Sequence, residues 1–168
     1  MPVITYFAFL TLVANVMFGI LLIFWKKLVK QLSPYILDLA IIFSTIATLG
    51  SLYLSNALYI PPCELCWFQR IFMYPLVIIL SVAKIRKTPK IWEIVLPLSI
   101  LGATISMYHY FLQLFPSISD SCGFATPCSD SSVRAFGYIT IPWMSFTAFA
   151  FIIVFMVILK KYEGSKNR

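Results

Sequence analysis

The sequence predicts an all-α integral membrane protein, a four-helix transmembrane bundle with one additional transmembrane helix at its N-terminus. Hydrophobic residues make up 61% of the 168 residues and charged residues 11%, whereas soluble domains average about 45–50% and about 25%. So apolar a chain cannot cover itself with a polar surface, which excludes an ordinary water-soluble domain. Five apolar runs supply the helices, because backbone polar groups inside lipid must be paired within a helix.

The apolar runs are separated by short polar or basic segments. The third run has 17 residues and reaches only about 25 Å as a helix, so we expect that helix to begin earlier, at Cys66 or its neighbours. The first run lacks a preceding basic residue and exceeds the core of a secretory signal, which favours a retained span. The five runs cover about residues 3–25, 35–60, 67–83, 91–115 and 136–159.

Basic residues predict the orientation of these helices. Eleven of the 13 Lys and Arg residues lie in three clusters, which fall on one face if every run crosses the membrane. Short basic loops stay in the cytoplasm, so we expect the N-terminus and both cysteine pairs outside and the C-terminus inside. Because the cations form no continuous stripe, the net charge of +7 does not indicate a nucleic-acid partner. The clusters lie at residues 26–30, 84–90 and 160–168.

The four cysteines form two close pairs, Cys63 with Cys66 and Cys122 with Cys128. Two prolines precede the first pair and place it at the start of the next helix, where free N–H groups and the helix dipole stabilise a thiolate. The second pair lies in a polar loop, where a disulfide closing so short a loop restrains little and is better suited to exchange than to stapling. A four-cysteine zinc site is a weaker alternative, since the outer face favours thiol oxidation.

Two polar residues lie within the predicted spans near the first cysteine pair. Arg70 is one helical turn beyond Cys66, about 6 Å deeper, and His109 is about 9 Å from the outer end of the fourth run. Arg70 could instead snorkel to the headgroups, and His109 could bond a neighbouring helix. Two such costly groups at similar depth favour one shared pocket for an apolar ring with two carbonyl oxygens. We expect its aromatic walls to come from Trp67, Phe68, Tyr108 or Tyr110.

Further motifs accompany the C-x-x-C in a fixed order. They are GSLY at 50–53, PCELCWFQR at 62–70, MYPL at 73–76, YHYFLQ at 108–113 and FGYITIP at 136–142. In this combination the chain resembles the DsbB/BdbC family of membrane disulfide-bond-formation proteins, and looks closest to its BdbC-type members. The leading apolar run has no counterpart in the four-helix core of that family.

The resemblance implies a membrane thiol-disulfide oxidoreductase of the bacterial cytoplasmic membrane that supports disulfide bond formation in exported proteins. Such a protein reoxidises an extracytoplasmic thioredoxin-like disulfide oxidase and passes the electrons to membrane quinone and the respiratory chain. The resemblance also implies that Cys122 and Cys128 exchange with the partner's dithiol. Cys63 and Cys66 would then accept the electrons and pass them on, which makes all four cysteines catalytic.

The same resemblance implies a binding site for ubiquinone or menaquinone and no metal. Cys66 would contact the quinone, and Arg70 would stabilise the charge that develops on it. His109 matches a family histidine near the quinone by its four-residue offset from Gln113.

The expected domain plan has two parts. Residues 1–30 form the additional transmembrane helix, and residues 31–168 form the quinone-linked redox bundle. An alternative function remains open at this point: a non-enzymatic polytopic protein, such as a transporter subunit or scaffold, whose disulfides are structural. That class predicts disulfides that resist mild thiol reagents.

Overall fold

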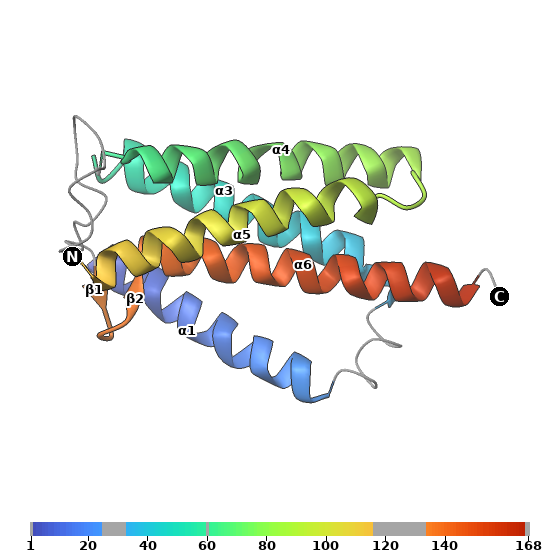
Figure 1. Ribbon diagram of the computed structural model, residues 1–168, viewed down its shortest axis with the longest axis horizontal. Coiled ribbons are helices and arrows are strands. Elements are labelled where there is room, and N and C mark those ends of the chain that lie inside the picture. Colours follow the sequence, from blue (N-terminus) through green and yellow to red (C-terminus); the bar gives the residue numbers. More distant parts are fainter. Residues whose placement is uncertain (1, 25–32, 60, 116–133, 167–168) are drawn as a thin grey trace.

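The computed structural model describes residues 2–24, 33–59, 61–115 and 134–166, which form an elongated helical bundle (Figure 1). In this described part, four helices have the length and hydropathy of membrane spans, and the first helix carries a shorter apolar stretch, Thr5–Leu21. The predicted all-α architecture is therefore confirmed. The elements are α1 (Pro2–Ile23), the 3-10 turn η1 (Ser33–Tyr35), α3 (Ile36–Asn56), α4 (Glu64–Arg86), α5 (Trp92–Leu114), the antiparallel strands β1 (Arg134–Ala135) and β2 (Ile139–Thr140), and α6 (Ile141–Lys166).

The observed starts of α4 and α6 test the helix boundaries predicted from the sequence. Helix α4 begins at Glu64 with Cys63 as its N-cap, which confirms that the short third run recruits the cysteine motif. The prediction that a helix begins at residue 136 was wrong, because residues 136–140 form the turn and second strand of the β1–β2 hairpin. Phe136 and Gly137 have positive φ angles of 51° and 81°, which a right-handed helix does not allow.

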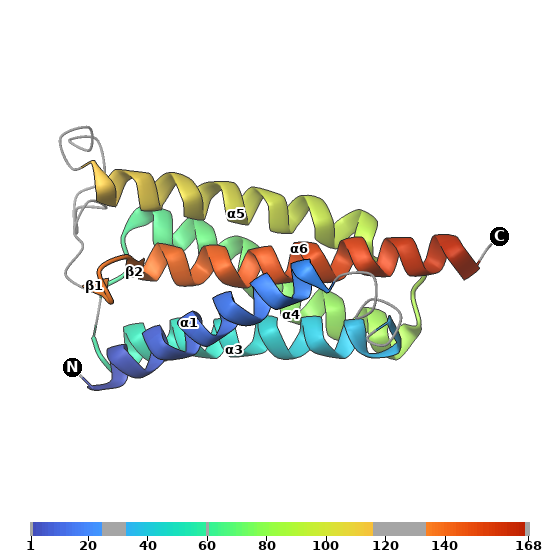
Figure 2. The same ribbon diagram turned by 90° about the horizontal axis from the view of Figure 1, so that it is seen from below.

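Helices α3, α4, α5 and α6 pack in a ring, each against its neighbours, with α1 against the side of α6. Figure 2 shows α1 lying obliquely beside α3 and α6, outside the four-helix ring. Helix α6 supplies more buried hydrophobic residues than any other described helix, and α1, α3 and α5 all pack on it. Its fully buried side chains include Phe149, Ile152 and Met156.

The two ends of the bundle differ in charge. The α4–α5 connection and the end of α6 lie at one end, and the β1–β2 hairpin and the start of α4 lie at the other (Figure 1). Lys84 in the last turn of α4 pairs with Asp38 in the first turn of α3 at the basic end. Within the described residues, the basic segments 84–90 and 160–166 thus lie at the opposite end from the Cys63–Cys66 motif, as the topology prediction requires. Which end faces the cytoplasm stays a prediction.

Gly102 marks a close approach between α5 and α6. A Cβ atom at this position would overlap the ring of the fully buried Phe149, with one ring carbon at only 2.8 Å. We expect Gly102→Ala to destabilise the protein by about 1–3 kcal/mol, as overpacking of a close-packed interior does. Thermal unfolding in detergent measures the effect.

The matched control is Gly19→Ala in α1, where a Cβ would have no neighbour within 4 Å. Its unfolding temperature should stay at or above that of the native sequence. Equal unfolding temperatures for the two variants would contradict the packing described for α5 and α6.

Candidate functional site

The first cysteine pair occupies the first turn of α4. Cys63 has extended backbone angles, φ −72° and ψ 172°, and its carbonyl accepts the first helical hydrogen bond from the Trp67 amide at 3.1 Å. The Cys63 side chain is buried, 8% exposed, whereas Cys66 is half-buried. Their sulfur atoms are 3.1 Å apart, with Cys63 donating to Cys66. The motif therefore forms a preorganised dithiol with one inner and one outer sulfur.

His109 on α5 lies beside the inner sulfur. Its Nε2 atom is 3.6 Å from Cys63 Sγ, and its Nδ1 atom is 3.0 Å from the Gln69 side-chain amide. The imidazole is only 1% exposed, and Gln69 is also buried. Sequence reasoning did not identify Gln69; the signal it missed is an amide one helical turn beyond Cys66 in an apolar helix, where a buried amide needs a partner.

Arg70 points toward α3. Its Nε atom donates to Ser51 Oγ at 3.0 Å, and Nη2 donates to the Ser51 carbonyl at 3.3 Å. The guanidinium also lies over the Trp67 ring, 5.4 Å from its centroid. Successive residues on a helix differ by about 100° in direction. Gln69 therefore contacts His109 from one face of α4, and Arg70 lies on another face. The structure thus places the two predicted polar groups on two sides of the dithiol motif.

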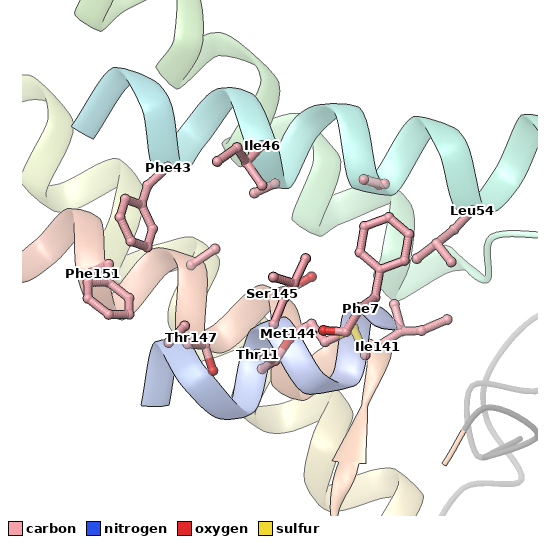
Figure 3. Close-up of a pocket in the computed structure, with 16 residues that line it drawn as sticks. Phe7, Thr11, Phe43, Ile46, Leu54, Ile141, Met144, Ser145, Thr147 and Phe151 are labelled. Atoms are coloured by element: carbon pink, nitrogen blue, oxygen red, sulfur yellow. Dashed lines mark hydrogen bonds between the residues drawn. The ribbon is translucent and has the colours of Figure 1, made fainter. Parts of the chain in front are cut away.

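A largely apolar cavity of about 170 Å³ lies between α1, α3 and α6. Figure 3 shows its lining, with Phe7 and Thr11 from α1, Phe43 and Ile46 from α3, and Met144 and Ser145 from α6. Ser51, which holds Arg70, is also in its wall. Ser51 therefore lines the cavity and also binds the guanidinium of Arg70.

The predicted aromatic walls do not line this cavity. Trp67, Phe68 and Tyr108 are each more than half exposed on the outer surface of the bundle. Tyr110 instead packs on Trp143, with ring centroids 5.0 Å apart. Trp67, Phe68 and Tyr108 therefore face outward from α4 and α5, whereas the cavity is lined by α1, α3 and α6.

The environment of Cys63 favours the protonated thiol. The hydrogen bond with Cys66 and desolvation by burial raise its pKa to about 12, and the hydrogen bond with His109 only partly opposes them. The inner sulfur is thus held as a thiol at neutral pH. The ligand atoms of Cys63, Cys66 and His109 all lie within 4.8 Å of one another, a spacing that also suits a metal ion.

Cys122 and Cys128, predicted to exchange with a partner, lie outside the described residues.

Comparison with known proteins identifies the family. The profile described as "Disulfide bond formation protein DsbB" matches residues 33–159, which include α3 to α6 except the last residues of α6. The chain belongs to the DsbB family. It is a multi-pass membrane protein of a bacterial oxidoreductase family that functions in disulfide bond formation. Helix α1 precedes the matched region.

Several curated relatives are similar to this DsbB-family chain. Disulfide bond formation protein C of Bacillus subtilis (strain 168) is 46% identical over 121 residues, covering 71% of this chain and 88% of the relative. Probable disulfide formation protein C 1 of Bacillus anthracis is 44% identical over 123 residues, covering 70% and 88%. Probable disulfide formation protein of Coxiella burnetii is 40% identical over 141 residues, covering 82% and 95%. No solved structure matches the chain significantly.

The difference in exposure and protonation between Cys63 and Cys66 can be tested by alkylation of the reduced, metal-free protein. The hydrogen bond with Cys66 and burial raise the pKa of Cys63, so little of this sulfur is thiolate at pH 8. We expect a small alkylating reagent to modify Cys66 at least 10-fold faster than Cys63, because thiolate is the nucleophile and Cys66 is more exposed. Mass spectrometry of the resulting peptides measures both rates.

The control is a variant with Cys122→Ser and Cys128→Ser, which removes the other two thiols. The preference for Cys66 should persist in it. Equal labelling of the two remaining cysteines would refute the protonated, buried state of Cys63.

Proposed function

We propose that this DsbB-family chain is a quinone-dependent protein-disulfide oxidoreductase of the bacterial cytoplasmic membrane. It reoxidises an extracytoplasmic thioredoxin-like disulfide oxidase and passes the electrons to ubiquinone or menaquinone. The observation that carries the proposal is the dithiol at the start of α4, with His109 on one side and Arg70 one turn below. The relatives' names, which concern disulfide formation, support the same reaction class.

The electrons move by two thiol–disulfide exchanges. A partner thiolate opens the Cys122–Cys128 disulfide, and the second partner thiol completes the exchange, so the partner is oxidised and this pair is reduced. The two resulting thiols then reduce the Cys63–Cys66 disulfide in the same way. Each exchange transfers two electrons and two protons and breaks one S–S bond for each one formed. Small differences in potential set the direction, since 30 mV corresponds to about 1.4 kcal/mol.

The two sulfurs of the α4 pair take different roles. Cys66 is the outer sulfur, lies in the first helical turn and is one turn above Arg70, so it is the group that delivers electrons onward. Cys63 is buried and hydrogen-bonded between Cys66 and His109. Because the Gln69 amide nitrogen faces Nδ1, His109 Nε2 carries the ring proton and is placed to donate it toward Cys63 Sγ. Gln69 fixes the imidazole by bonding its other nitrogen.

The residues near Arg70 fit a quinone ring. When bound, a quinone supplies an acceptor for two electrons and two protons. The cavity of about 170 Å³ exceeds the engineered apolar cavity of about 150 Å³ that admits benzene. Ser51 is part of the cavity wall and accepts hydrogen bonds from Arg70, which uses only two of its five N–H groups on this serine. The remaining N–H groups can stabilise negative charge on a carbonyl oxygen.

The predicted topology and domain plan belong to the same proposal. Both cysteine pairs lie outside the cytoplasm, with the N-terminus outside and the C-terminus inside. Residues 1–30 form an additional transmembrane helix beside the redox bundle of residues 31–168. The separation of the basic end from the dithiol end supports this arrangement.

Turnover tests the proposal directly. Purified protein mixed with a reduced thioredoxin-like oxidase and a soluble quinone should yield oxidised partner and quinol in equal amounts. Cys66→Ser should lower the rate by at least 10³-fold, because no other sulfur can replace the outer one. Quinol formation is followed by absorbance and partner oxidation by thiol trapping.

Thr104→Ser, a change on the lipid-exposed face of α5, should retain the native rate. An inactive native protein, or full turnover after Cys66→Ser, would contradict the proposed function.

Filling the cavity tests the quinone site. Ala47 lines the cavity on α3, and Ala47→Leu adds three carbons to a space that a ring would need. We expect KM for quinone to rise about 10-fold or more with kcat little changed, since binding is lost rather than chemistry. Steady-state kinetics over a range of quinone concentrations separates the two constants.

The matched control is Thr104→Leu, which places the same side chain on the exposed face of α5. It should leave KM within about twofold of the native value. An unchanged KM after Ala47→Leu would exclude this cavity as the quinone site.

A further inference from the structure

Cys63, Cys66 and His109 form a three-ligand cluster at the outer end of the bundle. Their sulfur and nitrogen atoms all lie within 4.8 Å of one another. In a tetrahedral zinc site with Zn–S of about 2.3 Å and Zn–N of about 2.0–2.1 Å, sulfur and nitrogen ligands are about 3.6 Å apart and two sulfurs about 3.8 Å. Cys63 Sγ and His109 Nε2 are already 3.6 Å apart.

The second sulfur needs only a small adjustment. Cys66 Sγ is 3.1 Å from Cys63 Sγ, so it must move away by less than about 1 Å to reach the sulfur–sulfur spacing of a tetrahedral site, and it already lies within 4.8 Å of the histidine nitrogen. Cys66 is half-buried, and the residue before it and the residue after it are not buried. A rotation of its side chain can supply this movement without displacing the helix.

Gln69 supplies the outer support that a metal-binding histidine requires. Its amide is 3.0 Å from His109 Nδ1. If the Gln69 amide group is turned by about 180°, its oxygen accepts a hydrogen bond from Nδ1–H. The Nε2 lone pair then points at the sulfurs. Such bonds to the second nitrogen fix the tautomer and orientation of histidine ligands.

We propose that the reduced form of this cluster binds a thiophilic divalent cation of the zinc type, with Cys63, Cys66 and His109 as protein ligands and the fourth position open. Binding displaces the two thiol protons and changes no oxidation state. A disulfide offers no thiolate, so the cation binds only after the pair has been reduced. Once bound, it occupies both sulfurs and blocks their exchange and their oxidation.

Cobalt(II) is the probe, because it takes tetrahedral zinc sites and is coloured in them. Full-length protein in detergent is reduced, freed of reductant without oxygen and titrated with Co²⁺. We expect one ion per chain, with a thiolate-to-cobalt charge-transfer band that Zn²⁺ abolishes. Protein whose cysteines have been oxidised should give no band.

Three variants separate this site from other thiol chemistry. His109→Ala should weaken Co²⁺ binding at least 10-fold, and Gln69→Leu should weaken it about 10-fold by loss of support for the histidine. A variant with Cys122→Ser and Cys128→Ser should bind as the native chain does. Loss of binding in that variant would instead indicate a four-cysteine site, and equal binding after His109→Ala would remove the histidine from the site.

A second measurement uses only the native sequence, so it does not depend on variant folding. Zn²⁺ should slow alkylation of Cys66 in the reduced protein at least 10-fold, and a chelator should restore the rate. Unaltered alkylation at saturating Zn²⁺, or no cobalt band at all, would overturn the proposal. Neither measurement uses a partner or a quinone, so a failure here leaves the turnover test of the proposed function independent, and the reverse also holds.

Discussion

The pairing of the buried His109 is the interaction on which the arrangement of the site depends. An imidazole that is 1% exposed within an apolar bundle has no water to bond, so its nitrogens need protein partners. Cys63 and Gln69 provide them from α4. Because both partners come from one helix and the ring from another, this network sets the register of α4 against α5 at the cysteine end. The position of the inner sulfur follows from that register.

The two sides of α4 divide the chemistry between them. On one face of α4, Gln69 contacts His109 of α5, which also contacts Cys63. On the next face, Arg70 donates to Ser51 of α3. The cysteine pair lies above both faces because it occupies the first turn. A dithiol in this position can be coupled to a proton-holding group on one side and to a cationic group on the other.

The sequence predicts the helices well and the contacts between them less well. Apolar runs and the two prolines before Cys63 determine where helices lie, because length and hydropathy act locally. The hairpin at residues 136–140 escaped prediction because its apolar residues continue the run of α6, and only Gly137 marks the turn. The placement of Arg70 on Ser51 could not be read from spacing, since it depends on how α3 rotates against α4. The position of a residue along its helix was predictable, but the direction of its side chain around the helix axis was not.

Helix α1 illustrates how a polar contact can place an otherwise featureless apolar helix. The Thr147 hydroxyl on α6 is 3.1 Å from Asn15 Oδ1 on α1, and Phe18 packs edge-on against Phe151. Between apolar helices in lipid, hydrophobicity gives no preference for one contact over another, so such bonds and close packing determine position. Gly50 adds to this, because a Cβ there would be 3.3 Å from the Phe7 ring. These contacts hold α1 against α3 and α6, where it forms one wall of the cavity that Ser51 also lines.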